Sequence, residues 1–294
     1  MNGAIRAPHS FRLSLKSMKE TTSNDTIEGV LPLLASDHGR FALLRMSLNR
    51  FWQGGTIHVI VRAEDMDRTR GLVGEDRRFN VVNQESLMGG VTGDSSGVGW
   101  WTQQILKLAA AQIVGSDFYL TLDADCLLVR NVSRDALVRN KRGLVEYDTP
   151  NRRANWYQAS SRLLGLPKTV PMRSVSVTPF LLHTGTAAAL TNHTAACARE
   201  RKVTSWQEML LNRPGWTEYT LYHLFAMSKG LWDTHHESES SDLIGPSVWF
   251  KEDAQKWNPS EAFEGERKFL FVVVQSNTHI EADWTSARVT RYLR

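Results

Sequence analysis

The sequence predicts an α/β protein whose central, mainly parallel sheet is covered by helices on both faces. Short apolar runs rich in β-branched residues alternate along the chain with longer stretches whose apolar residues recur at helical spacing. With 294 residues, 41% of them hydrophobic, the chain is long enough to bury a large core. The strands expected in the first half lie at 30–35, 56–61, 79–83 and 117–122.

Between these strands the sequence predicts helices and loops of contrasting character. Apolar residues at helical spacing predict a helix over 41–52, whereas the polar stretch 63–76 predicts a connection. The Gly- and Ser-rich stretch 88–99 predicts a loop suited to mobility or to close approach of a ligand. A helix is expected over 100–114, and Gly115 ends it.

The second half is less regular, but it continues the mixture of strands and helices. No linker or internal repeat divides the chain, so we expect one domain over residues 29–294 after a flexible tail at residues 1–28. The expected strands are 143–147, 175–178 and 268–275, and the expected helices are 184–200, 205–211, 217–229 and 281–293.

Composition excludes several classes of protein. The two cysteines, Cys126 and Cys197, form no disulfide framework or zinc pattern, which favours a reducing compartment. No apolar run approaches the roughly 20 residues of a membrane-spanning helix, and the first 28 residues lack the apolar core of a secretory signal, so we expect a cytoplasmic protein. The net charge of +4 is dispersed among nearby acids, which argues against a nucleic-acid partner and allows at most peripheral contact with a membrane.

A pair of acids follows the strand expected at 117–122. Asp123 and Asp125 are positioned where the carboxyl ends of parallel strands form ligand sites, and their carboxylates can share a divalent cation. Oxygen ligands favour Mg²⁺ or Mn²⁺ over zinc. The alternative is that this short motif only solvates a turn.

The sequence resembles the GT-A class of nucleotide-sugar glycosyltransferases, and more narrowly a little-characterised bacterial family of them. That family combines the pattern W-x-x-Q-Q-x-x-K-L with an aromatic-rich strand ending in L-D-x-D and then with S/T-E-Y-x-L-Y. Here the three motifs are found at 100–108, 122–125 and 217–222, in that order. His223 follows the last motif where family members usually have a small residue, a departure that bears on acceptor preference.

The resemblance implies a metal-dependent donor site. Asp125 would bind the Mn²⁺ or Mg²⁺ that bridges the diphosphate of a nucleotide-sugar, most plausibly a UDP-sugar, while Asp123 would reach the metal or the ribose. A histidine near the C-terminus completes the metal site in many GT-A enzymes, and His279 is the candidate. His235 and His236 are a competing source, and a polar loop residue is the alternative interpretation of His279.

Further residues are expected to contact the donor. Lys107 would add an ammonium group near the diphosphate, although a solvated helix face explains its position equally well. For the remaining residues near strand ends, an ordinary structural role is the alternative. The donor-binding set implied by the resemblance is Leu34, Ala35, Ser36, Arg62, Trp100, Gln103, Gln104, Lys107, Asp123 and Ala124.

Glu218 is the candidate catalytic residue. An inverting transfer needs a carboxylate that takes the proton from the attacking acceptor hydroxyl. Alternatively, Glu218 only complements the dipole of a helix that begins there, or it holds the acceptor in a retaining reaction. Trp216, two residues earlier, is expected to form part of an acceptor wall because sugar faces stack on aromatic rings.

These observations predict a glycosyltransferase that moves a sugar from a nucleotide-sugar donor to a hydroxyl of a glycan or glycolipid acceptor. One rival is a metal-dependent nucleotidyltransferase, but the stretch 35–40 is a poor match to the Gly-rich phosphate loop that such an enzyme needs. A non-catalytic sugar-binding or nucleic-acid-binding module is the other rival, and the dispersed charge disfavours the nucleic-acid form. The sequence does not indicate an oligomeric state.

Overall fold

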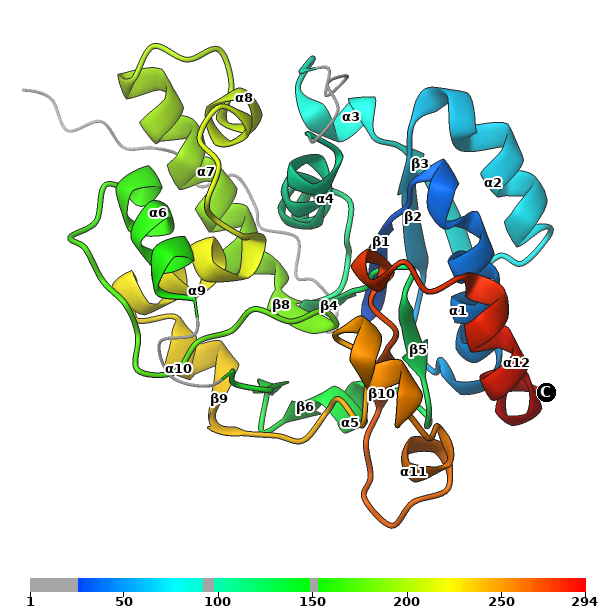
Figure 1. The fold of residues 1–294 in the computed structure, drawn as a ribbon. Helices are drawn as coiled ribbons and strands as arrows, with labels where there is room; N and C mark the ends of the chain where they lie inside the picture. Colours follow the sequence, from blue (N-terminus) through cyan, green and yellow to red (C-terminus); the bar gives the residue numbers. More distant parts are fainter. Residues whose placement is uncertain (1–25, 92–97, 149–152) are drawn as a thin grey trace, which may run out of the picture.

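The computed structural model describes residues 26–91, 98–148 and 153–294, and its centre is a five-stranded sheet in the order β3-β2-β1-β4-β8 (Figure 1). The first four of these strands are mutually parallel, and β8 pairs antiparallel with β4. This arrangement confirms the predicted α/β class with a mainly parallel sheet. The strands are β1 Glu28–Pro32, β2 Ile57–Val61, β3 Phe79–Asn83, β4 Phe118–Thr121 and β8 Phe180–His183.

Successive residues of each strand alternate between two hydrophobic layers, because side chains along a strand point to opposite faces of the sheet. Val30 and Tyr119 belong to the layer that also contains the helices α4 and α7, whereas Leu31 and Leu120 belong to the layer that contains α1. Figure 1 shows α1 and α12 on one side of the sheet and α4 and α7 on the other. Both faces of the sheet are therefore covered, as expected.

Two small sheets complete the strand arrangement. The antiparallel pair of β5 Cys126–Leu128 and β10 Phe271–Val273 brings the C-terminal part of the chain beside the residues that follow β4. A separate three-stranded sheet has the order β6-β7-β9. Its strands are β6 Val138–Arg139, β7 Arg142–Val145 and β9 His236–Ser240.

The helices of the described residues fall into a set that ends before β6 and a set that begins with α6, after β7. The first set is α1 His38–Phe51, α2 Met66–Val73, α3 Glu85–Met88, α4 Val98–Ala109 and α5 Arg134–Leu137, with short 3₁₀ turns at Ala35–Asp37, Ala63–Asp65 and Ala110–Gln112. The later helices are α6 Ala154–Leu164, α7 Thr184–Glu200, α8 Trp206–Leu211, α9 Glu218–Ser228, α10 Trp232–His235, α11 Ser260–Phe263 and α12 Ala282–Leu293, with 3₁₀ turns at Lys251–Gln255 and Ser276–Thr278.

Most expected elements are present, and the differences have local causes. Residues 175–178 form no strand, because Val175 donates its backbone N–H to the Tyr157 hydroxyl at 2.9 Å instead of to a neighbouring strand. The expected connection at 63–76 contains helix α2, whose residues were too polar for an apolar stripe to reveal it. Within the Gly- and Ser-rich stretch, 92–97 lie outside the described residues.

None of the helices in the described part of the chain combines the length and the apolar character that a bilayer crossing requires.

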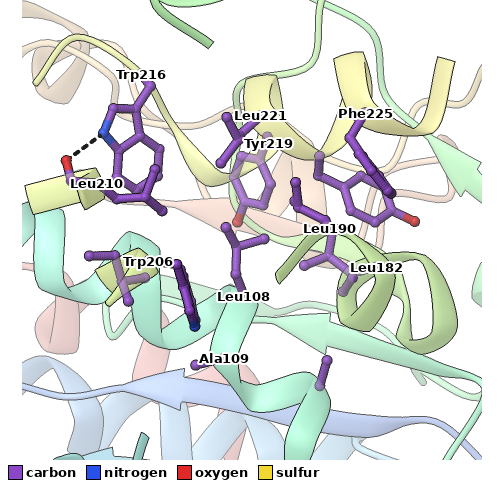
Figure 2. Close-up of a cluster of buried hydrophobic side chains, with 14 of the residues drawn as sticks. Leu108, Ala109, Leu182, Leu190, Trp206, Leu210, Trp216, Tyr219, Leu221 and Phe225 are labelled. Carbon is purple, nitrogen blue, oxygen red and sulfur yellow. Dashed lines mark hydrogen bonds between the residues drawn. The ribbon is translucent and has the colours of Figure 1, made fainter. Parts of the chain in front are cut away.

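The largest core cluster joins the sheet to the helices of the second half. Figure 2 shows Trp216, Tyr219 and Phe225 converging with Leu108 of α4 and Leu182 of β8. Trp216 is fully buried, and its indole N–H donates to the Leu210 carbonyl at 3.1 Å. This ring therefore contributes both apolar area and a satisfied polar group to the core.

We expect Trp216→Ala to lower the free energy of unfolding by about 3–5 kcal/mol, since it removes a large buried ring and leaves a cavity. Urea denaturation followed by circular dichroism measures this change. Met172→Ala is the control, because Met172 is exposed and its replacement should change the free energy by no more than about 0.5 kcal/mol. Equal effects of the two substitutions would contradict the packing described for Trp216.

Candidate active site at the carboxyl ends of β1 and β4

Asp123 and Asp125 lie directly beyond the carboxyl end of β4, where the chain turns into β5. The turn is closed by the Cys126 backbone N–H, which donates to the Asp123 carbonyl at 3.1 Å. The Ser276 backbone N–H donates to Asp125 Oδ2 at 2.8 Å. Burial, together with the nearby carboxylate of Asp123, raises the pKa of Asp125 to about 6. The two acids are thus close enough to repel each other, as carboxylates that share a cation do.

Lys107 of α4 connects Asp123 to Glu218. Its Nζ lies 2.8 Å from Asp123 Oδ1 and 3.0 Å from Glu218 Oε1, and it donates to Thr178 Oγ1 at 3.1 Å. The Lys107 side chain is only 1% exposed. The interpretation of Lys107 as part of a solvated helix face is therefore wrong, and the ammonium group lies among carboxylates instead.

Burial and charge oppose each other in this cluster. Burial alone would lower the pKa of Lys107, but the carboxylates of Asp123 and Glu218 outweigh it and raise that pKa well above its usual value. Burial raises the pKa of Glu218, although the Lys107 ammonium partly offsets the rise. One buried cation thus faces two carboxylates, which leaves an excess of negative charge at the Asp123 side of the cluster.

Glu218 is the first residue of α9, after Thr217, whose side chain accepts a hydrogen bond from the Thr220 backbone N–H. The sequence-based placement of Glu218 at a helix start is confirmed. Its carboxylate does more than complement the helix dipole, because it pairs with Lys107. The side-chain amide of Gln104 also lies against it, and with its nitrogen turned toward Glu218 it donates to the carboxylate.

Asp123, Asp125 and Glu218 line one open cleft of about 470 Å³. Aromatic side chains occur on its wall together with carboxylates, a combination suited to binding a molecule with both apolar faces and hydroxyl groups. The lining residues are Trp100, Gln104, Asp123, Asp125, Glu146, Tyr147, Asp148, Arg153, Trp156, Ser176, Val177, Thr178, Thr217, Glu218, Tyr219, Trp249, Phe250, Val273, Gln275 and Asn277.

Sequence reasoning missed Glu146, Asp148, Arg153, Trp156 and Phe250 as members of this cleft. Trp156 lies in the first turn of α6, whereas the other four lie outside the named helices and strands, where periodicity does not predict the direction of a side chain. The available signal was that several tryptophans lie in loops or near helix starts, as Trp156 does.

A smaller hollow beyond the ends of β1 and β2 collects several residues of the expected donor-binding set. Leu34, Arg62 and Gln103 line it together. Because β1 and β4 are neighbouring parallel strands, this hollow lies beside the turn that carries Asp123. The full lining is Pro32, Leu33, Leu34, Ile60, Arg62, Gln84, Gly99, Thr102, Gln103 and Leu106.

The other expected donor residues differ in position. Ala35 and Ser36 follow Leu34 in a 3₁₀ turn, and Ala124 is buried between the two acids. Trp100 and Gln104 line the large cleft instead of the smaller hollow.

Trp216 does not line the cleft, so its expected role as an acceptor wall is wrong. The ring is fully buried in the core, and it packs against Trp101 at a centroid distance of 5.5 Å. Its neighbour in sequence, Glu218, reaches the cleft because α9 begins between the two residues. Proximity in sequence to a candidate catalytic residue therefore did not place Trp216 at the site.

None of the three histidines considered as metal ligands is among the residues that line the cleft. His279 is exposed and, unlike Gln275 and Asn277, is not among the residues that line the cleft. His235 stacks on His183 at 3.6 Å, and His236 is buried among aromatic rings. Across 26–91, 98–148 and 153–294, no three His, Cys, Asp or Glu side chains are grouped so that they could hold a metal ion.

Comparisons with known proteins give one family and distant structural likenesses. The model of a family described as "Family of unknown function (DUF6492)" matches residues 24–294. The search of curated proteins gave no match. Similar solved structures include the apo form of mouse xyloside xylosyltransferase 1, at 14% identity and a TM-score of 0.47, over 87% of this chain and 100% of that one.

The apo structure of the bifunctional glycosyltransferase WbbM is also similar, at 9% identity and a TM-score of 0.48. This match covers 85% of the present chain but only 46% of the WbbM chain. At such identities neither structure assigns a role to a residue of this protein.

We expect Lys107→Met to lower the free energy of unfolding by about 3–5 kcal/mol at neutral pH, because it leaves the buried carboxylate of Glu218 without its cation. Without Lys107 the folded-state pKa of Glu218 lies above its unfolded value of about 4.3, so the penalty is complete above the folded-state pKa, shrinks as the pH falls from there toward about 4.3, and is absent below it. Urea denaturation at several pH values measures both effects.

Lys256→Met, at an exposed lysine, is the control and should change the free energy of unfolding by no more than about 0.5 kcal/mol. A Lys107→Met penalty that does not depend on pH would contradict the ion pairs described for this cluster.

Proposed function

The chain belongs to the family DUF6492, whose model matches residues 24–294, and we propose that it is a metal-dependent glycosyltransferase that uses a nucleotide-sugar donor, a UDP-sugar. The observation that carries the proposal is the shared cleft at the carboxyl ends of β1 and β4. It combines the paired acids Asp123 and Asp125 with the carboxylate of Glu218 and with aromatic side chains, and it adjoins a second hollow. Ligands of open α/β sheets bind at this edge.

Asp123 and Asp125 fit a hard divalent cation. Lys107 contacts one oxygen of Asp123, and Ser276 contacts Oδ2 of Asp125. The Cys126 thiol donates only a weak hydrogen bond to Asp125 Oδ1, at 3.8 Å, so each carboxylate keeps an oxygen with lone pairs for a ligand. Mg²⁺ is typically held by one or two carboxylates together with substrate phosphates, so two protein ligands suffice. When bound, Mn²⁺ or Mg²⁺ would neutralise the diphosphate and make it a better leaving group. The predicted third ligand, His279, is not needed for this arrangement.

The donor would lie in the large cleft and across the mouth of the smaller hollow, whose interior of about 10 Å³ has room for a single water. Leu34, Arg62 and Gln103 are positioned to contact the base and ribose at this mouth, beside the acids that would hold the diphosphate. The sugar would then lie in the large cleft, near Glu218. Lys107 would keep Asp123 oriented toward the donor, since its ammonium group fixes one oxygen of that carboxylate.

For the reaction itself we propose inversion. The acceptor hydroxyl oxygen would form a bond to the anomeric carbon as the bond between that carbon and the diphosphate oxygen breaks. The hydroxyl proton would pass to the carboxylate of Glu218, and the nucleoside diphosphate would leave with the bonding electrons. Burial raises the pKa of Glu218, which makes this carboxylate a stronger base than one in water.

A thermal-shift series with UDP, GDP, CMP and TDP tests the donor site. We expect one nucleotide to stabilise the protein only with Mn²⁺ or Mg²⁺, by about 2.7 kcal/mol at 100 times its Kd, and chelation with EDTA to abolish the effect. Asp125→Ala should remove the stabilisation.

Asp117→Ala is the matched control for this series, because Asp117 precedes β4 and lies at the opposite end of that strand. This variant should respond to the nucleotide as the unchanged protein does. A folded protein that responds to no nucleotide would contradict the proposed function.

The role of Glu218 is tested by Glu218→Gln. We expect kcat to fall about 10²–10⁴-fold while the nucleotide-dependent thermal shift persists, because the amide cannot accept the proton. Glu85→Gln is the control, since Glu85 begins the exposed start of α3 and can only complement a helix dipole. Proton NMR of the first product determines the anomeric configuration, and retention would exclude Glu218 as an inverting base.

A further inference from the structure

We propose that the large cleft binds an uncharged saccharide as the acceptor, held by aromatic rings from two separate segments, and that it disfavours acidic sugars. This inference rests on the proposed function and specifies its acceptor. The two segments are the start of α4 with Trp100 and the segment before the 3₁₀ turn Lys251–Gln255, with Trp249 and Phe250.

Exposed aromatic rings are concentrated at this cleft. Within the described part of the chain, four large hydrophobic side chains are exposed: Trp100 at 45%, Phe250 at 60%, Met172 at 85% and Met227 at 43%. The two aromatic ones both line the cleft, and the two methionines do not. Apolar rings left open to water beside polar groups indicate a binding surface, and the apolar faces of sugar rings stack on such rings.

The Trp100 ring is supported from the core outward. Trp216 packs on Trp101 at 5.5 Å, Trp101 packs on Trp100 at 4.5 Å, and Trp100 lies 6.3 Å from Trp156. The guanidinium of Arg153 covers the Trp156 ring at 4.4 Å. This chain of contacts holds Trp100 in place before a ligand binds, which lowers the entropic penalty of binding.

The segment that contains Trp249 and Phe250 is held by hydrogen bonds to a carboxylate. Asp253 Oδ2 accepts hydrogen bonds from the backbone N–H groups of Trp249 and Phe250, at 3.0 and 2.8 Å. The carboxylate thus fixes the backbone that presents both rings. Aromatic side chains in both segments are therefore preorganised by contacts that do not involve a ligand.

The charge of the cleft indicates which saccharides fit. Five carboxylates line it, whereas Arg153 is the one lining cation among the residues described, and the nearby Lys107 is held by Asp123 and Glu218. Glu146 Oε2 accepts from the backbone N–H groups of Leu243 and Ile244, at 2.9 and 2.7 Å, so this acid is fixed in place.

Carboxylates accept hydrogen bonds from sugar hydroxyls but repel the carboxylate of a uronic or sialic acid. The negative charge of a donor diphosphate would be offset by the divalent cation, so the excess of carboxylates over cations in the cleft would remain. The charge of the site therefore favours a neutral sugar over an acidic one.

Trp100 was expected to contact the donor. It lines the large cleft, where the donor sugar and the acceptor would meet, and not the hollow that contains Leu34 and Arg62. We therefore assign it to the saccharide side of the site.

Saturation-transfer NMR and isothermal titration of the full chain, with UDP and Mn²⁺ present, test this inference. The probes are a set of neutral pentoses, hexoses and N-acetylhexosamines as methyl glycosides, with two matched pairs: glucose and glucuronic acid, and lactose and sialyllactose. We expect at least one neutral glycoside to bind and the acidic member of each pair to bind more weakly than the neutral one.

Trp100→Ala and Phe250→Ala should each weaken binding of that glycoside about tenfold, because each removes one stacking ring. Met172→Ala and Met227→Ala, at exposed side chains outside the cleft, should leave the affinity unchanged. The thermal shift with UDP and Mn²⁺ should persist in all four variants, which also verifies that they fold.

Results that differ from these expectations overturn the charge argument, the stacking surface or the proposed function itself. Equal or preferential binding of glucuronic acid or sialyllactose would refute the charge argument, and unchanged affinity in both aromatic variants would refute the stacking surface. If no neutral glycoside binds while the nucleotide shift persists, this inference fails and the proposed function stands. If the nucleotide shift itself is absent, the proposed function fails.

Discussion

The candidate site depends above all on the buried ammonium group of Lys107. Its contacts with Asp123 and Glu218 join α4, the end of β4 and the start of α9, which are far apart in the sequence. Without a cation, the buried carboxylate of Glu218 would have no ion-pair partner, and burial would favour its protonated form. With it, Glu218 stays in the cleft and one oxygen of Asp123 is fixed. The same contact therefore determines the position of the proposed base and of the proposed metal ligand.

Strand pairing supplies the rest of the frame. Because β1 and β4 are adjacent and parallel, the smaller hollow and the D-x-D turn share one edge of the sheet. The pairing of β5 with β10 then brings Ser276 from the C-terminal region to Asp125. The strands therefore hold Asp123 and Asp125 at a fixed distance from the smaller hollow, as a reaction at this edge would require. The wall of the cleft comes partly from helices and partly from irregular segments, and the irregular segments are the parts of a fold where substrate preference can vary without loss of the core.

Local sequence predicted the elements well where their pattern was strong. The apolar runs at 56–61 and 79–83 match β2 and β3, and the helices expected at 205–211 and 281–293 match α8 and α12 within a residue. The sequence-based prediction of strands failed where contacts between distant residues took the place of regular strand pairing. Val175 bonds to a tyrosine hydroxyl instead of a strand, and β5 is too short for alternation to be visible.

The sequence by itself determined the α/β class, the position of Asp123 and Asp125 after a buried strand, and the position of Glu218 at a helix start. These features follow from periodicity and capping, which act over a few residues. Only the tertiary structure decided that Lys107 pairs with Asp123 and Glu218. It also decided that Trp216 belongs to the core and that His279 does not line the cleft. Lys107 and Glu218 are separated by 111 positions. Contacts across such a distance arise from how helices pack on the sheet, and no local pattern encodes them.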